Sequence, residues 1–169
     1  ELVKKSQLED VKVEISDAKQ YIIDSLSGKY NALHIFGHDR NIMPWYKPIE
    51  ESISSGKLDV FASELTGKDF FIVLEDANID QAALEYVIGS SLSSGQVCMS
   101  PEGAFVHEKV KDKFIEAIQK YSAAILLVGN PNNPETDIGP LMSDGVYANA
   151  RQLIEDTKAK GSRSYPLDL

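Results

Sequence analysis

Two short blocks of this sequence carry side chains that could work together in acyl chemistry. The first block, Glu64–Lys68, supplies a carboxylate, and the second, Gly95–Cys98, ends in the only cysteine among 169 residues. A cysteine thiolate can form a covalent adduct with a carbonyl carbon, and a positioned carboxylate can activate the water that cleaves it. Cys98 and Glu64, 34 residues apart, are therefore the candidate nucleophile and the candidate general base.

Each of these side chains also has a simpler interpretation. A free cysteine is more often a buried structural residue than a nucleophile, and a single glutamate is usually a solvated carboxylate. Glu64, however, stands at the end of an apolar run and close to Gly67, where backbone can approach a ligand closely. The two blocks together favour a catalytic role for Cys98. Lys68 is expected to be structural and to pair with a carboxylate.

The two blocks resemble the signatures of the aldehyde dehydrogenase superfamily, E-L-G-G-K and G-Q-x-C, which stand at the same separation. Further segments are similar to family counterparts and follow in the same order, at residues 69–80, 104–107, 128–131 and 136–140. The similarity is strong from residue 64 to about 160, whereas residues 11–63 match only as a pattern of elements. Each motif alone is weak evidence, but the ordered set is specific.

This resemblance implies NAD- or NADP-dependent oxidation of a small-molecule aldehyde to a carboxylic acid. Cys98 would carry the thiohemiacetal and the thioester, and Glu64 would activate the water that hydrolyses the thioester. Gly37, Leu65 and Gly67 are the expected cofactor-binding residues, and a homo-oligomer is an expected assembly. The alternative, from a different class, is a non-catalytic aldehyde dehydrogenase-like remnant that serves as a binding or structural module.

The run Phe36–Asp39 departs from the family pattern F-T-G-S, in which small residues at a helix N-terminus face the cofactor pyrophosphate. Asp39 brings a carboxylate to that place unless it turns away to cap the helix. We therefore expect the isolated chain to bind NAD weakly or not at all. The run Pro44–Pro48 resembles the family's P-W-N-x-P block, but it stands too close to Glu64 and is interpreted as a coincidence.

Bulk properties exclude several classes of function. A net charge of −9 and a pI near 4.8 argue against nucleic acid or a membrane surface as a partner. A single cysteine excludes an intrachain disulfide and fits a reducing compartment, so a cytoplasmic location is expected. No metal site is predicted, because the three histidines lack ligand spacing and residues 76–87 lack the glycine and glutamate of a calcium-binding loop.

The length and the ends of the chain leave its completeness open. It begins at Glu1 without an initiator methionine and shows no secretory leader. It is also much shorter than the usual aldehyde dehydrogenase. A fragment, a truncated paralogue and an incompletely represented chain all fit these observations.

The elements that would position the candidate groups follow an α/β order, with incomplete Rossmann-like parallel sheets. Residues 1–63 are predicted to form the rear half of a dinucleotide-binding domain, and residues 64–169 the first part of the catalytic (thiol) domain. Strands are predicted at 11–15, 32–36, 58–62, 70–74, 104–106 and 124–128. Helices are predicted at 18–26, at 39–53 with proline interruptions, and at 80–92, 111–121 and 147–159, with a loop at 129–140. The expected helix caps are Ser16-Asp17, Asp39, Asp76 and Asp80.

Overall fold

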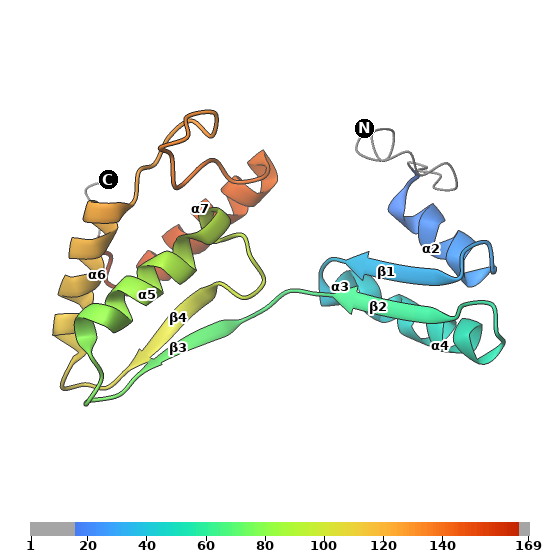
Figure 1. Ribbon diagram of the computed structural model, residues 1–169, viewed down its shortest axis with the longest axis horizontal. Coiled ribbons are helices and arrows are strands. Elements are labelled where there is room, and N and C mark those ends of the chain that lie inside the picture. Colours follow the sequence, from blue (N-terminus) through green and yellow to red (C-terminus); the bar gives the residue numbers. More distant parts are fainter. Residues whose placement is uncertain (1–15, 166–169) are drawn as a thin grey trace. The chain divides into compact units, whose positions relative to one another are not determined.

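The computed structural model describes residues 16–165, which divide between Thr66 and Gly67 into two compact units (Figure 1). Each unit holds a parallel sheet of two strands. The first unit contains α2 (Ala18–Leu26), β1 (Ala32–Phe36), α3 (Asp39–Ile42), η1 (Met43–Trp45), α4 (Tyr46–Ser54) and β2 (Val60–Glu64). The second contains β3 (Asp69–Val73), α5 (Ile79–Ser91), η2 (Leu92–Gly95), β4 (Pro101–Val106), α6 (Lys111–Ile125) and α7 (Asp144–Ala159).

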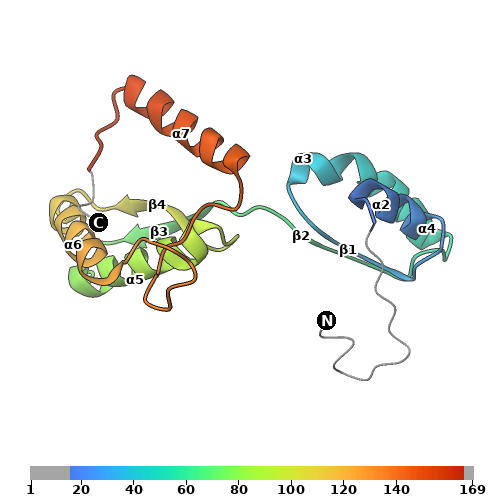
Figure 2. The same cartoon turned by 90° about the horizontal axis from the view of Figure 1, so that it is seen from above.

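In the first unit, helices cover one face of the sheet formed by β1 and β2 (Figure 2). Alternate side chains of a strand point to opposite faces, so Leu33 of β1 is buried while its neighbours are exposed. Its core partners are Ile22 of α2, Ile49 of α4 and Leu58, which precedes β2. The opposite face carries exposed apolar side chains, including Phe36 and Val60.

The second unit repeats this design with β3 and β4, and α5 and α6 pack on one face of the sheet (Figure 2). Its core is a cluster of Val73, Ala83, Val110, Phe114 and Ala117. The opposite face again exposes large apolar groups, among them Ile72 and Phe105. The last helix, α7, has no buried residue.

The predicted fold class is confirmed, because each unit combines helices with a sheet of two parallel strands joined by helical segments. The strand predicted at 58–62 lies two residues later, and the one predicted at 11–15 falls outside the described residues. The strand predicted at 124–128 is wrong. Helix α6 continues through alanines, the best helix formers, to Ile125, and Val128 makes only an isolated bridge with Ile138.

The structure confirms the predicted cap at Asp17 and corrects three others, Asp39, Asp76 and Asp80. Asp17 does cap α2, since its carboxylate accepts hydrogen bonds from the N–H groups of Lys19 and Gln20. Asp39, however, is the first residue of α3, and the cap is His38, whose Nδ1 accepts from the N–H of Arg40. An aspartate in the first turn of a helix also interacts favourably with the positive end of the helix dipole. The sequence alone therefore does not distinguish a capping aspartate from one at the first helical position.

The start of α5 shows the same kind of correction. Asn78 caps this helix by accepting from the N–H of Gln81, so neither Asp76 nor Asp80 is the cap. Asp80 lies in the first turn and accepts a hydrogen bond from the hydroxyl of Tyr121 at 2.9 Å. The side chain therefore ties α5 to α6.

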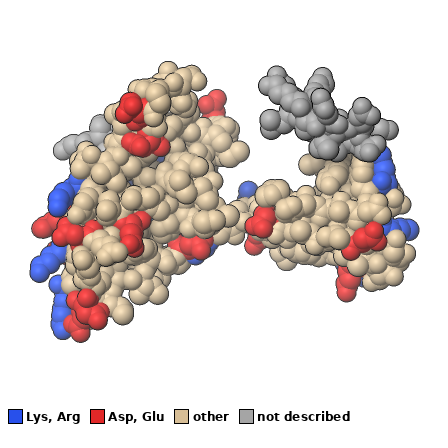
Figure 3. All heavy atoms as spheres, in the orientation of Figure 1, with Lys and Arg blue, Asp and Glu red and all other residues tan. Residues whose placement is uncertain are grey.

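Charged groups on the second unit lie as mixed pairs on its surface. Figure 3 shows both signs interspersed beside α6, on the face that it draws. Lys120 pairs there with Asp80 at 3.5 Å, and Lys68 pairs with Glu102 as the sequence predicts. Within residues 16–165, no helix combines the length and apolar character needed to cross a bilayer. Across the same residues, no three His, Cys, Asp or Glu side chains gather as metal ligands would.

Candidate active site

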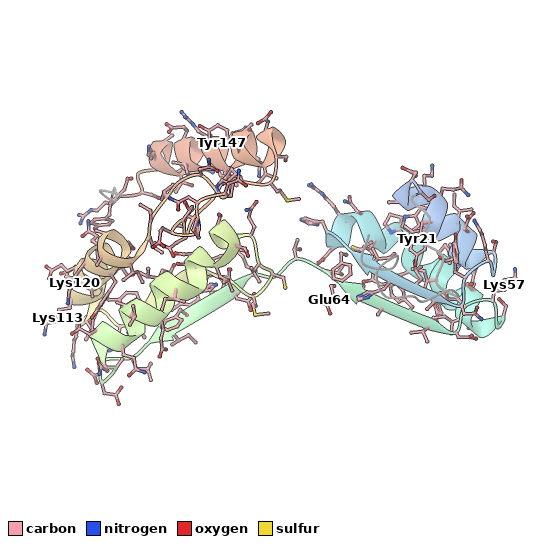
Figure 4. The ribbon with its side chains drawn as sticks, turned by 45° about the horizontal axis from the view of Figure 1, so that its top comes forward. Tyr21, Lys57, Glu64, Lys113, Lys120 and Tyr147 are labelled. Carbon is pink, nitrogen blue, oxygen red and sulfur yellow. The ribbon has the colours of Figure 1, made fainter. Side chains whose placement is uncertain are left out.

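Glu64 lies at the carboxyl end of β2, with its side chain exposed (Figure 4). The register of the parallel pair sets Glu64 opposite Phe36, the last residue of β1. The N–H of Gly37 then donates to the carbonyl of Glu64 at 3.0 Å. Ligands of open α/β sheets bind outside the carboxyl ends of the strands, so this edge is the expected place for one.

Two of the candidate cofactor residues lie at this edge. Gly37 directly follows β1, and Leu65 directly follows β2. A side chain at Gly37 would meet nothing within 4 Å, so its backbone faces open space. Asp39 brings a carboxylate into the first turn of α3, a helix of only four residues. The edge is therefore open to a ligand, but its charge opposes a phosphate group.

Cys98 lies in the second unit, in the segment that joins η2 to β4, and its side chain is exposed. The chain reaches it through three consecutive residues with positive φ: Ser93 at 51°, Ser94 at 60° and Gly95 at 73°. A left-handed conformation costs a non-glycine residue roughly 1–2 kcal/mol. Other contacts must therefore hold this turn in place.

Gly67, the third candidate cofactor residue, packs against the backbone of Cys98. A Cβ atom added at Gly67 would lie 1.8 Å from the carbonyl oxygen of Cys98 and 2.5 Å from the carboxylate of Asp69. No side chain fits such a distance, so glycine is required here for close approach of two backbone segments. The second half of the Glu64–Lys68 block thus touches the end of the Gly95–Cys98 block.

Two side-chain hydrogen bonds tie the cysteine segment to a loop more than forty residues downstream. The amide oxygen of Gln96 accepts from the N–H of Met142 at 2.8 Å. The hydroxyl of Ser94 donates to the carbonyl of Gly139 at 3.1 Å. Sequence reasoning named the blocks that contain Gln96 and Gly139 without linking them, because nothing in a single sequence marks a contact at that separation.

The downstream loop is itself held by its own backbone and side chains. Asp137 and Ile138 donate their N–H groups to the carbonyl of Leu127, and the carboxylate of Asp137 accepts from the N–H of Leu127. The hydroxyl of Thr136 donates to the carbonyl of Asn130. This network explains the residues 136–140 motif in physical terms, since it fixes the loop against which the cysteine segment rests.

Ser100, two residues after Cys98, is buried, and among the described residues its hydroxyl has no hydrogen-bond partner. Its N–H donates to the carbonyl of Val97, which closes a turn around Cys98. The pattern of the sequence gave no sign of this hydroxyl. Glu64 and Cys98 belong to different compact units, so their meeting in one site stays a prediction.

Comparisons with known proteins agree on one family. The family model described as "Aldehyde dehydrogenase family" matches residues 44–165, more than half of the chain. An aldehyde dehydrogenase-like protein of Schizosaccharomyces pombe is 33% identical over 115 residues, which cover 68% of this chain and 23% of that protein. A benzaldehyde dehydrogenase of Bacillus subtilis is 41% identical over 97 residues, which cover 55% of this chain and 20% of that protein.

Solved structures show the same likeness. Succinate-semialdehyde dehydrogenase from Burkholderia pseudomallei matches with a TM-score of 0.83 at 23% identity, over 98% of this chain and 34% of that one. An NADP-dependent glyceraldehyde-3-phosphate dehydrogenase from Bacillus halodurans, solved with NADP, matches with a TM-score of 0.62 at 27% identity, over 82% of this chain and 28% of that one. The chain therefore spans only about a fifth to a third of the proteins that it matches.

Proposed function

This chain belongs to the aldehyde dehydrogenase family, and we propose on that premise that it takes part in the NAD- or NADP-dependent oxidation of an aldehyde to a carboxylic acid. The observation that carries the proposal is the contact between the two blocks of the sequence. Gly67 packs on the backbone of Cys98, and Glu64, the first residue of the same block, is the last residue of β2. In this proposal the first unit is the rear part of the cofactor domain and the second the first part of the catalytic domain.

Cys98 is the nucleophile in this scheme. Its thiolate attacks the carbonyl carbon of the aldehyde, the C–S bond forms, and the π electron pair moves onto the oxygen to give a thiohemiacetal. Backbone N–H groups, including that of Cys98, are suited to stabilise the developing oxyanion. The exposure of Cys98 and its place between a fixed turn and a strand support this role, because the thiol is accessible and its backbone is held.

The cofactor would be held at the carboxyl edge of β1 and β2, by Gly37 and Leu65, with Gly67 nearby in sequence. When bound, a nicotinamide dinucleotide would supply a hydride acceptor, which oxidises the Cys98 adduct to a thioester. The open space at Gly37 supports this placement, and the solved relative with bound NADP supports the class of cofactor. Asp39 is the feature that weakens it.

Glu64 is the general base of the final step. It takes a proton from water as the water oxygen attacks the thioester carbon, and the C–S bond then breaks to release the carboxylic acid and the Cys98 thiolate. The exposed carboxylate at the strand end supports this role, since it is reachable by water.

Single substitutions in the intact protein test this division of labour. Cys98→Ala should abolish formation of the acid, whereas Glu64→Gln should still form the thioester rapidly once and then hydrolyse it slowly. The readouts are steady-state rate and the size of the initial burst of reduced cofactor. An unchanged dehydrogenase rate in the Cys98→Ala protein contradicts the proposal.

A second candidate is a non-catalytic relative that uses the fold as a binding module. The observation in its favour is Asp39, which places negative charge at the helix that would face the pyrophosphate. Intact mass and the reading frame of the gene distinguish the two. A frame of the length of the matched relatives favours the enzyme, and a natural stop after Leu169 favours the binding module.

A further inference from the structure

The segment that carries Cys98 holds a strained turn that its own backbone does not explain. Ser93 and Ser94 both adopt positive φ, the region that disfavours residues with a side chain. Gly95 continues the same conformation, and the N–H of Gln96 closes the turn onto the carbonyl of Ser93 at 3.2 Å. Strain of this kind persists only where surrounding contacts determine the conformation.

Gln96 supplies such contacts through both ends of its amide. Its Nε2 donates to the carbonyl of Ser93 at 3.1 Å, and its Oε1 accepts from the N–H of Met142 at 2.8 Å. One side chain therefore spans the strained turn and the downstream loop. The Ser94 hydroxyl adds a parallel bond to Gly139 at 3.1 Å.

We propose that Gln96 is a positioning residue for Cys98. Together with Ser94 it forms a clamp that fixes the cysteine segment on the Gly139–Met142 loop, and so fixes the direction in which the thiol meets the carbonyl carbon. This inference rests on the proposed function for the identity of the reaction, but the clamp itself is a property of the second unit. Gln96 acts through the backbone and touches no reacting atom.

The clamp explains why two motifs that stand far apart in the chain occur together. The Gly95–Cys98 block provides the amide and the thiol. Gly139 of the residues 136–140 motif accepts from the Ser94 hydroxyl, and Met142, two residues beyond that motif, donates its N–H to the amide oxygen of Gln96. A reacting group that drifts by about 1 Å can lose on the order of a hundredfold in rate. Gln96 would prevent such drift.

The test compares Gln96→Met, which keeps the length of the side chain without its hydrogen bonds, with Gln96→Glu, which keeps an oxygen for the N–H of Met142. The control is Gln152→Met, on the exposed surface of α7. Hydrogen exchange of the Met142 amide should quicken about two- to tenfold in Gln96→Met, the range expected for one lost hydrogen bond. Exchange in α5 and α6 should not change, and Gln96→Glu should stay near the parent chain.

Alkylation gives a second readout at a single site, because Cys98 is the only cysteine of the chain. The thiolate displaces iodide from iodoacetamide, with formation of the S–C bond, and intact mass follows the product. Its rate should differ about two- to tenfold between Gln96→Met and the parent chain, since the thiol is already exposed and the lost hydrogen bonds free the segment that orients it. In the intact enzyme the same substitution should lower kcat about tenfold or more with a smaller change in KM, and Gln96→Glu should restore part of kcat.

Two outcomes overturn the clamp. One is exchange and alkylation in Gln96→Met that match Gln152→Met. The other is unchanged hydrogen exchange at residues 139–142 in Ser94→Ala, which lacks the hydrogen bond from the Ser94 hydroxyl to Gly139. Failure of the proposed function would give a different result, because the intact Cys98→Ala protein would then retain dehydrogenase activity. The exchange and alkylation measurements on the Gln96 variants test the clamp independently of that activity.

Discussion

The two units share one architecture but hold their candidate residues in different ways. In each, two parallel strands carry helices on one face and expose apolar side chains on the other. Glu64 is exposed at the end of its strand. The neighbouring Gly37 has nothing within 4 Å of the position that a Cβ atom would take. The backbone of Cys98 instead packs closely against Gly67, and its segment is hydrogen-bonded to the Gly139–Met142 loop. A nucleophile needs a fixed direction of attack, whereas a base that acts through water tolerates more freedom.

The largest effects are expected from substitutions in the two separate cores. Phe114→Ala should cost the second unit about 3–5 kcal/mol, and Leu33→Ala should cost the first about 2–5 kcal/mol, because both side chains are almost fully buried. Each change should raise hydrogen exchange in its own unit and leave the other unit protected. Equal loss of protection in both units after either substitution would show that they unfold as one body.

A pair of glycines turns the comparison between the units into a direct test. Gly67→Ala should destabilise the second unit by about 1–3 kcal/mol, because the new methyl group meets the carbonyl oxygen of Cys98 at 1.8 Å. Gly37→Ala should leave stability nearly unchanged, since nothing lies within 4 Å of the new atom. Denaturant unfolding measures both. Similar losses at the two positions would contradict the difference in packing.

The sequence predicted local features well and long-range contacts poorly. Periodicity and the cap at Asp17 were sufficient to predict α2 and β1 at the residues where they occur. The end of α6 was missed because a run of apolar residues from Ala123 to Val128 suits a helix or a strand equally. His38 was missed as a cap because an adjacent aspartate is the commoner capping residue.

For the candidate site, too, the sequence predicts local motifs but not the contacts between distant residues. Cys98 and Glu64 were identified from motifs whose letters are contiguous, and the paired Lys68 from its charge. The bond from the N–H of Met142 to Gln96 joins residues 46 positions apart, and only the folded chain brings them together. The buried Ser100 hydroxyl is equally a result of packing, with no local signal.

A smaller effect is expected at the edge of β1 and β2. Asp39→Asn removes negative charge from the first turn of α3 and should tighten NAD binding about two- to fivefold, in line with the 0.3–1 kcal/mol of a charge at a helix end. Asp144→Asn is the matched control, because Asp144 is also the first residue of a helix but lies in the second unit. Calorimetric titration with NAD and NADP measures both. Equal changes in NAD affinity in the two variants would show that Asp39 does not lie at the cofactor site.

The smallest expected effect concerns acid stability of the first unit. A hydrogen bond from Lys29 at 2.8 Å, with a second from Gln20, holds the pKa of Asp24 below its ordinary value of 3.8. A carboxyl group with a lowered pKa in the folded state stabilises the fold above its unfolded pKa, and this contribution disappears as the pH falls through the folded value. The parent chain should therefore be more stable than Asp24→Asn at neutral pH, and the difference should shrink once the pH falls below about 4.

Glu50→Gln is the control for this acid effect, because the Glu50 side chain is exposed on α4 and takes part in none of the side-chain hydrogen bonds or ion pairs found among the described residues. Thermal unfolding, monitored by hydrogen exchange in α2, measures the stability of the parent chain and of each variant from pH 7 to pH 3. Because Asp24 and Lys29 both lie on the surface, salt should reduce the advantage of the parent chain as well. If stability falls with pH in the same way in Asp24→Asn and in the parent chain, the Asp24–Lys29 pair does not contribute to the acid sensitivity of the first unit.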